Sequence, residues 1–399
     1  MRNGALRSAP VARVLSLLLA SCVLFAGCSI GEDDDAVPPQ IGVKADDDEA
    51  AADLGFPFTA TKNTTRVGGG DAIADVAGVA SAVWPATSET TRPNAVVLVD
   101  KDNWQGGIAA SVFAGTTIGA PLLLSDGGEL PAVSRDTLER LDPKGSDLTK
   151  DAQVIRIGSR PPEPEGRRTT TIDGGDVYEL AGAIDRFHAV ARGEPSDDVI
   201  VASGERAEYA MPAAALAARS GDAVLLTKRG ALPGPTVEAL KRHEKPNVFV
   251  LGPESVIGTA VEKKLRPLAR RVQRIEGPTP VQNAIEFARF QSGSFGWGAE
   301  VPGQNFTIAS TSRPLDAVGA ASLATNGVFA PLLLTDDADA LPRSLESYLL
   351  DVQPGFEDDP SLSVFNHVWI LGDGDTISVE QQGRIDEVSA LIPVELNQP

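Results

Sequence analysis

Three closely similar apolar segments lie far apart in this 399-residue chain, and they constrain its fold more than any other feature. The first reads Gly-Ala-Pro-Leu-Leu-Leu-Ser-Asp at 119–126, and its counterparts lie at 221–228 and 329–336, each followed shortly by a Leu-Pro pair. A period of roughly 100 residues predicts three copies of a domain-sized unit rather than a solenoid of small repeats. Three sites of one kind favour a multivalent binder over an enzyme, which needs one reactive centre.

Each copy repeats the same order of apolar and polar segments. In the first copy, strands are expected at 95–99, 121–125 and 153–157, with a small-residue helix at 107–117 and a second helix from Pro131. Fully apolar strands that alternate with helices predict a parallel sheet covered on both faces. We therefore expect three small doubly wound α/β units of about four strands each. The central strands are expected to contain 122–124, 224–226 and 332–334.

The N-terminus has the features of an export signal. Arginines precede an apolar run at 14–25, which ends in Leu24-Phe25-Ala26-Gly27-Cys28 and resembles a bacterial lipobox. The resemblance implies a lipoprotein signal peptide at 1–27 and acylation of Cys28, which would hold the chain at a membrane. The alternative is an ordinary secretory signal with an incidental cysteine. The other cysteine, Cys22, lies within the signal, so no disulfide is expected.

Acidic residues dominate the charge of the chain. Its formal net charge of −20 argues against nucleic acid as a partner, because binding there relies on Lys and Arg at phosphates. Part of the acid lies in two runs at 32–35 and 46–49, on either side of Pro38-Pro39. Residues 28–60 are therefore predicted to be a disordered, self-repelling tether. Calcium binding is the alternative, but the runs lack the spacing of a known calcium loop.

The order of several short sequence motifs resembles that of the cell wall-binding repeat 2 family. The motifs include Arg66-Val67-Gly68, Arg274-Ile275-Glu276-Gly277 and Asp316-Ala317, together with the three apolar segments. The resemblance implies a Rossmann-like α/β fold in triplets packed with pseudo-threefold symmetry, as in surface proteins of Gram-positive bacteria. It also implies non-covalent attachment to anionic cell-wall polymers. The implied repeats are 61–160, 161–270 and 271–399, which leave no room for a separate catalytic domain.

Several polar positions differ from the family pattern. The family usually has Asp-Arg-Tyr after the opening word, whereas this chain has Asp71-Ala72-Ile73 in the first copy and Pro278-Thr279-Pro280 in the third. The Asp-Ala motif is present only in the third copy, as Asp316-Ala317. Glu208 stands at the equivalent position in the second copy. These differences affect the expected ligand more than the expected fold.

Five charged residues are candidates for contact with a polymer. Guanidinium groups bind phosphate or carboxylate in a bidentate manner, which singles out Arg66, Arg274 and Arg313. The same arginines would otherwise be surface residues paired with the abundant acids. Asp316 and Glu208 are further candidates, with a role at the start of a helix as the alternative.

Patterns typical of enzymes are missing from the sequence. Gly68-Gly69-Gly70 lacks the third glycine of a dinucleotide site and is expected to be a tight strand-to-helix turn. His188, His243 and His367 stand alone, so neither a metal nor a cofactor is expected. There is no Gly-x-Ser-x-Gly nucleophile elbow.

Together these features predict a lipid-anchored protein at the outer face of the cytoplasmic membrane, in the cell envelope. It would bind a cell-wall polymer or glycan through three repeated modules and would not be an enzyme. The alternatives are a Rossmann-like enzyme or receptor for a sugar or nucleotide, and an envelope scaffold that binds no polymer. The acid excess opposes an anionic polymer unless divalent cations or local arginines intervene.

Overall fold

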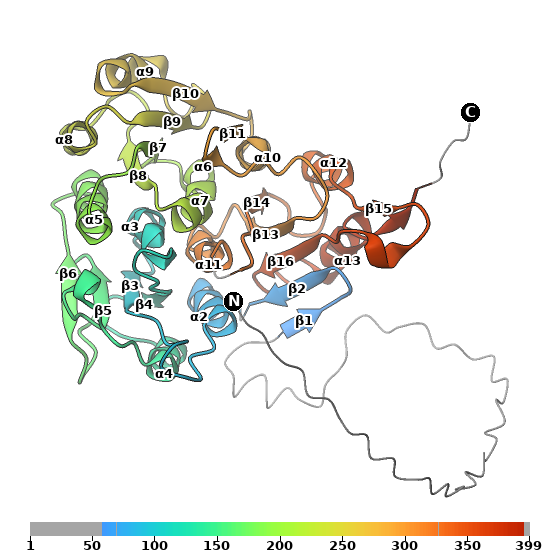
Figure 1. Cartoon of the computed structure of the whole chain (residues 1–399), viewed down its shortest axis with the longest axis horizontal. Coiled ribbons are helices and arrows are strands. Elements are labelled where there is room, and N and C mark those ends of the chain that lie inside the picture. The colour runs from blue at the N-terminus through green and yellow to red at the C-terminus, as the bar shows by residue number, and fades with distance from the viewer. Residues whose placement is uncertain (1–57, 69, 326, 395–399) are drawn as a thin grey trace, which may run out of the picture. The chain divides into compact units, whose positions relative to one another are not determined.

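The fold is given by a computed structural model that describes residues 58–394, apart from residues 69 and 326. The predicted signal peptide at 1–27, Cys28 and residues 29–57 of the predicted tether lie outside the described residues. Residues 58–60, the end of the predicted disordered tether, instead form a strand, so the prediction was wrong there. The described chain is a mixed α/β structure in which helices surround small parallel sheets, as Figure 1 shows. The predicted α/β class is therefore confirmed.

Three main sheets have the same spatial order of strands. The first strand lies between the second and the third, and a fourth pairs with the third, all in parallel. The first sheet contains β3 (Val96–Asp100), β4 (Leu122–Ser125), β5 (Val154–Ile157) and β6 (Thr169–Ile172). The second contains β7 (Asp198–Ser203), β8 (Ala223–Thr227), β9 (Asn247–Leu251) and β10 (Arg271–Ile275). The third contains β13 (Asn305–Ser310), β14 (Leu332–Thr335), β16 (His367–Leu371) and β2 (Thr64–Val67), with β1 (Phe58–Ala60) antiparallel at its edge.

Helices connect the strands and cover the sheets. Three of them begin directly after the prolines of the Leu-Pro pairs, where the sequence predicted helices, but each proline is the extended N-cap residue rather than the first helical residue. The helices are α2 (Ala72–Val83), α3 (Trp104–Ala110), α4 (Ala132–Leu141), α5 (Val177–Arg192), α6 (Ala207–Ala210), α7 (Pro212–Ser220), α8 (Gly234–Arg242), α9 (Thr259–Leu265), α10 (Pro280–Arg289), α11 (Asp316–Leu323), α12 (Arg343–Asp351) and α13 (Val379–Val388). Short 3-10 turns are η1 (Ser111–Ala114), η2 (Asp147–Thr149), η3 (Arg266–Leu268) and η4 (Pro360–Leu362), and short strand pairs are β11 (Gln291–Ser292) with β12 (Phe295–Gly296) and β15 (Gly355–Phe356) with β17 (Ile392–Pro393).

The three apolar segments form β4, β8 and β14, but these are not central strands. Each lies at one edge of its sheet, so this part of the prediction was wrong. All three are nevertheless buried, because α2, α5 and α10 pack against them. A helix that covers an edge shields the unpaired backbone of that edge. A continuous apolar run therefore indicates that a strand is buried, but it does not indicate that the strand is central. An edge strand is also buried when a helix covers it.

The fourth strand of each sheet comes from the start of another predicted repeat. β6 lies at the start of the predicted second repeat but pairs with β5, and β10 lies at the start of the predicted third repeat but pairs with β9. β2 lies at the start of the predicted first repeat and pairs with β16 near the other end of the described chain. Each sheet thus takes its fourth strand from outside the predicted repeat that supplies its other three strands.

Glycine turns carry the chain from each fourth strand to the next sheet. After β6, a Cβ on Gly174 would lie 2.4 Å from the backbone nitrogen of Leu180. After β10, a Cβ on Gly277 would lie 2.3 Å from the backbone nitrogen of Asn283. Neither distance is compatible with a side chain, so the close approach of each turn to the following helix requires glycine.

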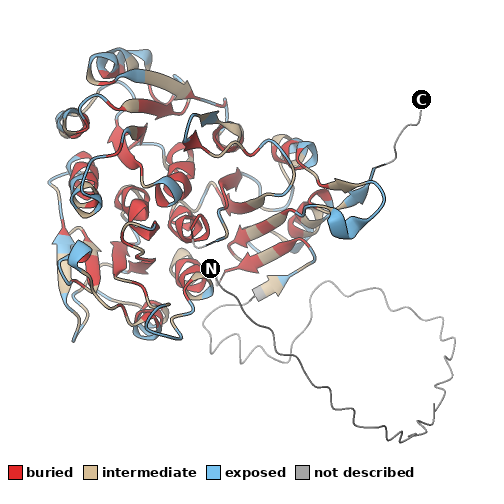
Figure 2. Cartoon of the chain, in the orientation of Figure 1, coloured by how far each residue is buried: buried red, intermediate tan, exposed pale blue. Residues whose placement is uncertain are grey.

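Helices rich in alanine and glycine fill the space between the sheets. α11 contacts both α2 and α7, and one cluster of buried residues includes side chains from all three main sheets. Figure 2 shows buried segments on the facing sides of these elements. A Cβ on Gly115 would lie 2.3 Å from the carbonyl oxygen of Ala218, and one on Gly107 would lie 2.8 Å from Cγ2 of Val318. Small residues thus let these helices approach closely.

Arg66 holds β2 to the third sheet. Its side chain is buried, with a residue exposure of 5%. Nη1 donates to the carbonyl oxygens of Gly372 and Asp373, both at 2.8 Å, and Nη2 donates to that of Ile377 at 2.7 Å. Nε donates to Oε1 of Gln382 at 2.9 Å. One side chain on β2 therefore satisfies several carbonyls of the turn between β16 and α13.

We predict that Arg66→Met destabilises the protein by about 3 kcal/mol, because it leaves buried carbonyls without donors. Methionine keeps an apolar stem, so the loss reports the hydrogen bonds more than the packing. Urea unfolding of the full chain measures the effect. Arg186→Met is the matched control, because Arg186 lies at an exposed position on α5 and its replacement should leave stability unchanged. A loss below about 1 kcal/mol for Arg66→Met would contradict the role of Arg66 as a buried clamp.

Candidate functional site

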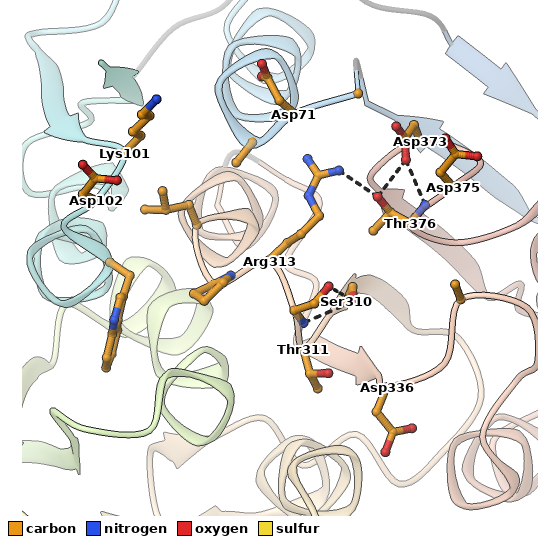
Figure 3. Close-up of a pocket in the computed structure, with 17 residues that line it drawn as sticks. Asp71, Lys101, Asp102, Ser310, Thr311, Arg313, Asp336, Asp373, Asp375 and Thr376 are labelled. Atoms are coloured by element: carbon orange, nitrogen blue, oxygen red, sulfur yellow. Dashed lines mark hydrogen bonds between the residues drawn. The ribbon is translucent and has the colours of Figure 1, made fainter. Parts of the chain in front are cut away.

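An open pocket of about 910 Å³ lies beyond the carboxyl ends of strands in the third sheet. Its lining residues come from segments 70–72, 101–104, 310–315, 336–338 and 373–376, and Figure 3 shows their side chains around the opening. Four of these segments follow β2, β13, β14 and β16, and the fifth follows β3 of the first sheet. Open α/β sheets bind ligands at this end of their strands. The pocket therefore lies between the third sheet and the loop after β3 of the first sheet.

The turn between β2 and α2 forms one wall of the pocket. A Cβ on Gly68 would lie 2.7 Å from the carbonyl oxygen of Gly372, so this turn lies against the turn after β16. Asp71 caps α2, because its Oδ1 accepts a hydrogen bond of 2.8 Å from the backbone N–H of Ala74. The cap uses a backbone donor that a phosphate at this helix start would need. The geometry agrees with the expected strand-to-helix turn.

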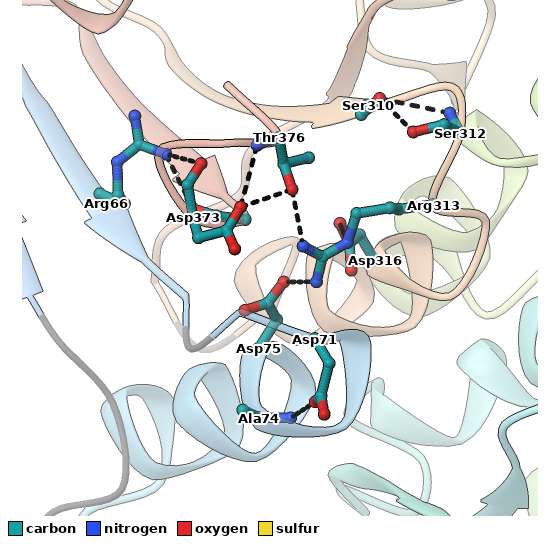
Figure 4. Close-up of polar contacts among 11 residues, drawn as sticks. Arg66, Asp71, Ala74, Asp75, Ser310, Ser312, Arg313, Asp316, Asp373 and Thr376 are labelled. Carbon is teal, nitrogen blue, oxygen red and sulfur yellow. Dashed lines mark hydrogen bonds and ion pairs between the residues drawn. The ribbon is translucent and has the colours of Figure 1, made fainter. Parts of the chain in front are cut away.

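Arg313 lies in the pocket wall and links the loop after β13 to helix α2, as Figure 4 shows. Its guanidinium forms an ion pair with Asp75 of α2, and its Nε lies 3.1 Å from Oδ2 of Asp316 at the start of α11. Nη1 also donates to Oγ1 of Thr376 at 2.9 Å. The Arg313 side chain is only 14% exposed, and both carboxyl groups are fully buried. One positive charge therefore faces two buried carboxyl groups.

The charge balance of this cluster favours a retained proton. Burial, together with the negative charge of Asp75, raises the pKa of Asp316 well above its usual range. With Asp316 protonated, the remaining charges are one guanidinium and one carboxylate. We therefore assign the proton to Asp316 and the ion pair to Arg313 and Asp75.

Arg274 occupies the position of Arg66 in the second sheet. Its Nη1 donates to the carbonyl oxygen of Gly252 at 2.6 Å, and its Nη2 donates to Oε2 of Glu262 at 3.1 Å. In the first sheet the clamp comes from the neighbouring strand, where Arg156 donates to the carbonyl oxygen of Pro161 at 2.7 Å. Arg66 and Arg274 thus hold strand-end turns, and neither lines the pocket. Their contact with a polymer stays a prediction.

Glu208 lies on α6, away from the residues that line the pocket. Its Oε1 is 2.6 Å from Nη2 of Arg206, which also packs over the ring of Tyr209. The structure therefore brings together Arg313 and Asp316 among the five predicted residues. It does not bring Glu208, Arg66 or Arg274 to this pocket.

Sequence reasoning missed several residues of the site. Asp75 is the only acidic residue within the apolar helix α2. An isolated acid in such a segment could have indicated a buried ion pair. Lys101, Trp104 and Thr376 lie just after strand ends, where side chains converge only once the sheets are placed. Asp373 was missed for the same reason.

Neither a metal centre nor a membrane span is found in the part of the chain that the structure describes. No group of three or more His, Cys, Asp and Glu side chains in that part is arranged to hold a metal ion. Among the same residues, no helix combines the length and apolar character needed to cross a membrane.

Residues 171–262 match the family model of cell wall binding domain 2 (CWB2). The match lies within the segment predicted as the second repeat and extends from β6 to α9. The resemblance predicted from the sequence is thereby confirmed over these residues. The family is described by binding rather than by a reaction, which agrees with the prediction that the chain is not an enzyme. No curated protein sequence matches the chain.

Two solved structures from Clostridium difficile are similar to the chain. Cwp8 has a TM-score of 0.62 and 20% sequence identity, over 82% of this chain and 52% of that one. Cwp6 also has a TM-score of 0.62, with 18% identity over 84% of this chain and 49% of that one. The chain thus spans about half the length of either protein. At this level of identity the likeness shows a shared fold.

The cluster around Arg313 predicts how stability depends on pH. A raised pKa of Asp316 means that the folded state keeps a proton that the unfolded state has lost, so stability falls as pH rises towards the folded pKa. Asp316→Asn should remove this dependence. Relative to the variant, the natural chain should lose about 1.4 kcal/mol per pH unit across that window.

Urea unfolding between about pH 4 and pH 8 measures the difference, since the window begins near the ordinary pKa of aspartate. Asp136→Asn, at an exposed position on α4, is the control and should follow the natural chain. If Asp316→Asn is instead destabilised by several kcal/mol at neutral pH, Asp316 is ionised there and the assignment of the proton is wrong.

Proposed function

We propose that this chain is a lipid-anchored protein of a Gram-positive cell envelope that binds a cell-wall polymer or glycan without covalent chemistry. The observation that carries the proposal is the CWB2 match at 171–262. The acylated Cys28 holds the chain at the outer face of the cytoplasmic membrane, and the residues between Cys28 and β1 act as its tether. The protein thus bridges the membrane and the wall.

The binding modules are three Rossmann-like units arranged with pseudo-threefold symmetry, corresponding to the repeats 61–160, 161–270 and 271–399. The identical strand order of the three main sheets supports this part of the proposal. A second support is that the opening strand of each repeat pairs with the third strand of another repeat's sheet in all three cases. Several weak sites on one chain bind a repetitive polymer far more tightly than one site does.

The structure favours binding over catalysis at the strand ends. In the first two repeats the helix after the opening strand is capped by an aspartate, Asp71 or Asp176, and in the third by Thr279. A nucleotide-binding Rossmann enzyme needs these backbone donors for phosphate. We therefore propose that the polymer contacts the pocket. Arg313 lines its wall and is held in place by Asp75 and Asp316.

The binding prediction is tested by sedimentation of the purified full-length chain with native cell walls. The chain should sediment with native walls and remain in solution when the secondary polymers have been stripped from them. Binding through charged groups should weaken as the salt concentration rises, because exposed charges are screened.

Native and stripped walls from one preparation provide the matched control. Absence of sedimentation with native walls at low salt, with and without calcium, would contradict polymer binding and favour a scaffold. Turnover of a nucleotide-sugar by the same chain would instead support the enzyme alternative.

The anchor is tested in cells by Cys28→Ser. The variant should move from the membrane fraction to the soluble or secreted fraction, because no acyl chain can be attached. Cys22→Ser is the matched control and should stay with the membranes. Membrane retention of Cys28→Ser equal to that of the natural chain would rule out lipid attachment at this residue.

A further inference from the structure

Positive charge is concentrated in one part of this acidic chain, around α9 and β10 of the second sheet. Residues 241–274, from the end of α8 to β10, contain nine Lys and Arg and three Glu. Residues 351–387, the corresponding segment of the third sheet, contain nine Asp and Glu and one Arg. In Figure 1, α9 and β10 lie on the side of the molecule away from β15 and β17. The described chain therefore has a basic end and an acidic end.

Six exposed cationic residues lie on adjoining segments of the second sheet and its connections. Two are lysines of α9, which is followed directly by η3 and then by β10. The backbone N–H of Arg270 donates to the carbonyl oxygen of Pro246 at 2.9 Å, so the turn before β10 lies against the turn before β9. Arg271 pairs with Asn247 in the parallel register of these strands. We call these six residues the basic surface: Lys245, Lys263, Lys264, Arg266, Arg270 and Arg271.

Few acidic groups compensate the basic surface. Glu262 faces two guanidinium groups, with Nη2 of Arg266 at 3.0 Å and Nη2 of Arg274 at 3.1 Å. Nη2 of Arg270 lies 4.0 Å from Oδ1 of Asp197, whose side chain is 88% exposed. Among the residues that the structure describes, the three lysines of the basic surface have no ion-pair partner. The basic surface thus keeps an excess of positive charge.

The basic surface is separate from the candidate site. Lys245 precedes β9 and Arg271 begins β10, whereas the pocket lies beyond the carboxyl ends of strands, and no residue of the basic surface lines it. Strand β10 is the edge of its sheet, so the cations lie on a helix, a turn and a strand start at an exposed face. An extended anionic strand is typically bound in a groove that follows it. A broad exposed face instead complements a planar array of anionic groups.

We propose that the basic surface binds anionic phospholipid headgroups of the membrane that carries the lipid anchor. Each Lys or Arg near an anionic lipid surface is attracted to it, and the attraction acts within about a Debye length. The exposed acidic residues 357–359 belong to the acidic end and are repelled by the same surface. Both ends therefore favour one orientation, in which the second sheet faces the membrane.

The predicted tether is long enough for this orientation. It has 29 residues between Cys28 and Phe58, and a chain of that length spans at most about 100 Å. An anchored chain meets the membrane at a high effective concentration, so a weak headgroup contact suffices to orient it. The anchor belongs to the proposed function, whereas the basic surface is a second contact that goes beyond it.

Vesicle co-sedimentation tests the inference with the mature chain, which starts at residue 28 and carries Cys28→Ser so that no acyl chain contributes. One set of vesicles contains phosphatidylcholine alone, and the other contains phosphatidylcholine and phosphatidylglycerol. The chain should bind the anionic vesicles at least about tenfold more tightly than the neutral ones. Rising salt should abolish the preference. Inorganic phosphate should displace the chain no more than chloride does at equal ionic strength.

Charge reversal connects the binding to the basic surface. Lys263→Glu together with Lys264→Glu should weaken binding to the anionic vesicles at least about tenfold. Arg135→Glu together with Arg186→Glu is the matched control, because it changes the net charge equally at exposed positions on α4 and α5. The control should weaken binding at most about threefold. Thermal melting verifies that both variants are folded.

Equal binding to the two kinds of vesicle, no binding to the anionic ones, no effect of the lysine reversal, or an equal loss in the control would each overturn the inference. Stronger displacement by phosphate than by chloride would also overturn it, because the surface would then recognise phosphate groups in general. Sedimentation with native walls separates the inference from the proposed function. The lysine variant should sediment with walls as the unchanged chain does. If it does not, the basic surface contacts the wall polymer and the membrane inference is wrong.

Discussion

The parallel pairing of β2 with β16 is the contact on which the rest of the structure depends. It joins Thr64 to Val368 and Arg66 to Ile370 in register, across almost the whole described chain. Side chains reinforce it, since Oδ1 of Asp386 on α13 accepts a hydrogen bond of 2.7 Å from the backbone N–H of Asn63. Because the other two sheets also take their fourth strand from the start of the next predicted repeat, none of the three sheets is complete without a neighbouring segment. The three sheets are therefore expected to fold together, at the entropic cost of closing a long loop.

The same contact builds the candidate site. When β2 joins the third sheet, the glycine turn after it meets the turn after β16, and α2 passes on to cover β4 of the first sheet. Asp75 on α2 is thereby brought to Arg313, and the loop after β3 completes the pocket wall. The pocket thus depends on the pairing of β2 with β16, and neither the first sheet nor the third forms it alone.

The elements of the fold could be predicted from local sequence, and their partners could not. Apolar runs and Leu-Pro pairs marked β4, β8, β14 and the helices after them, because burial and proline geometry act within a few residues. Nothing local in Thr64–Val67 says that its partner is β16, since parallel pairing leaves no turn sequence between the strands. For the same reason, the arginines were predicted as charged groups available to a polymer, whereas the fold buries Arg66 among carbonyls and Arg313 between carboxyl groups.

The arginines singled out in the sequence act within the protein. Arg66 donates to backbone carbonyls, whereas Arg274 and Arg313 form ion pairs with Glu262 and Asp75. A buried ion pair adds little net stability, because desolvation offsets the attraction, but it fixes where its partners lie. Arg313 therefore acts mainly by fixing α2 against the third sheet. What remains at the surface of the pocket is an excess of carboxylates over cationic groups.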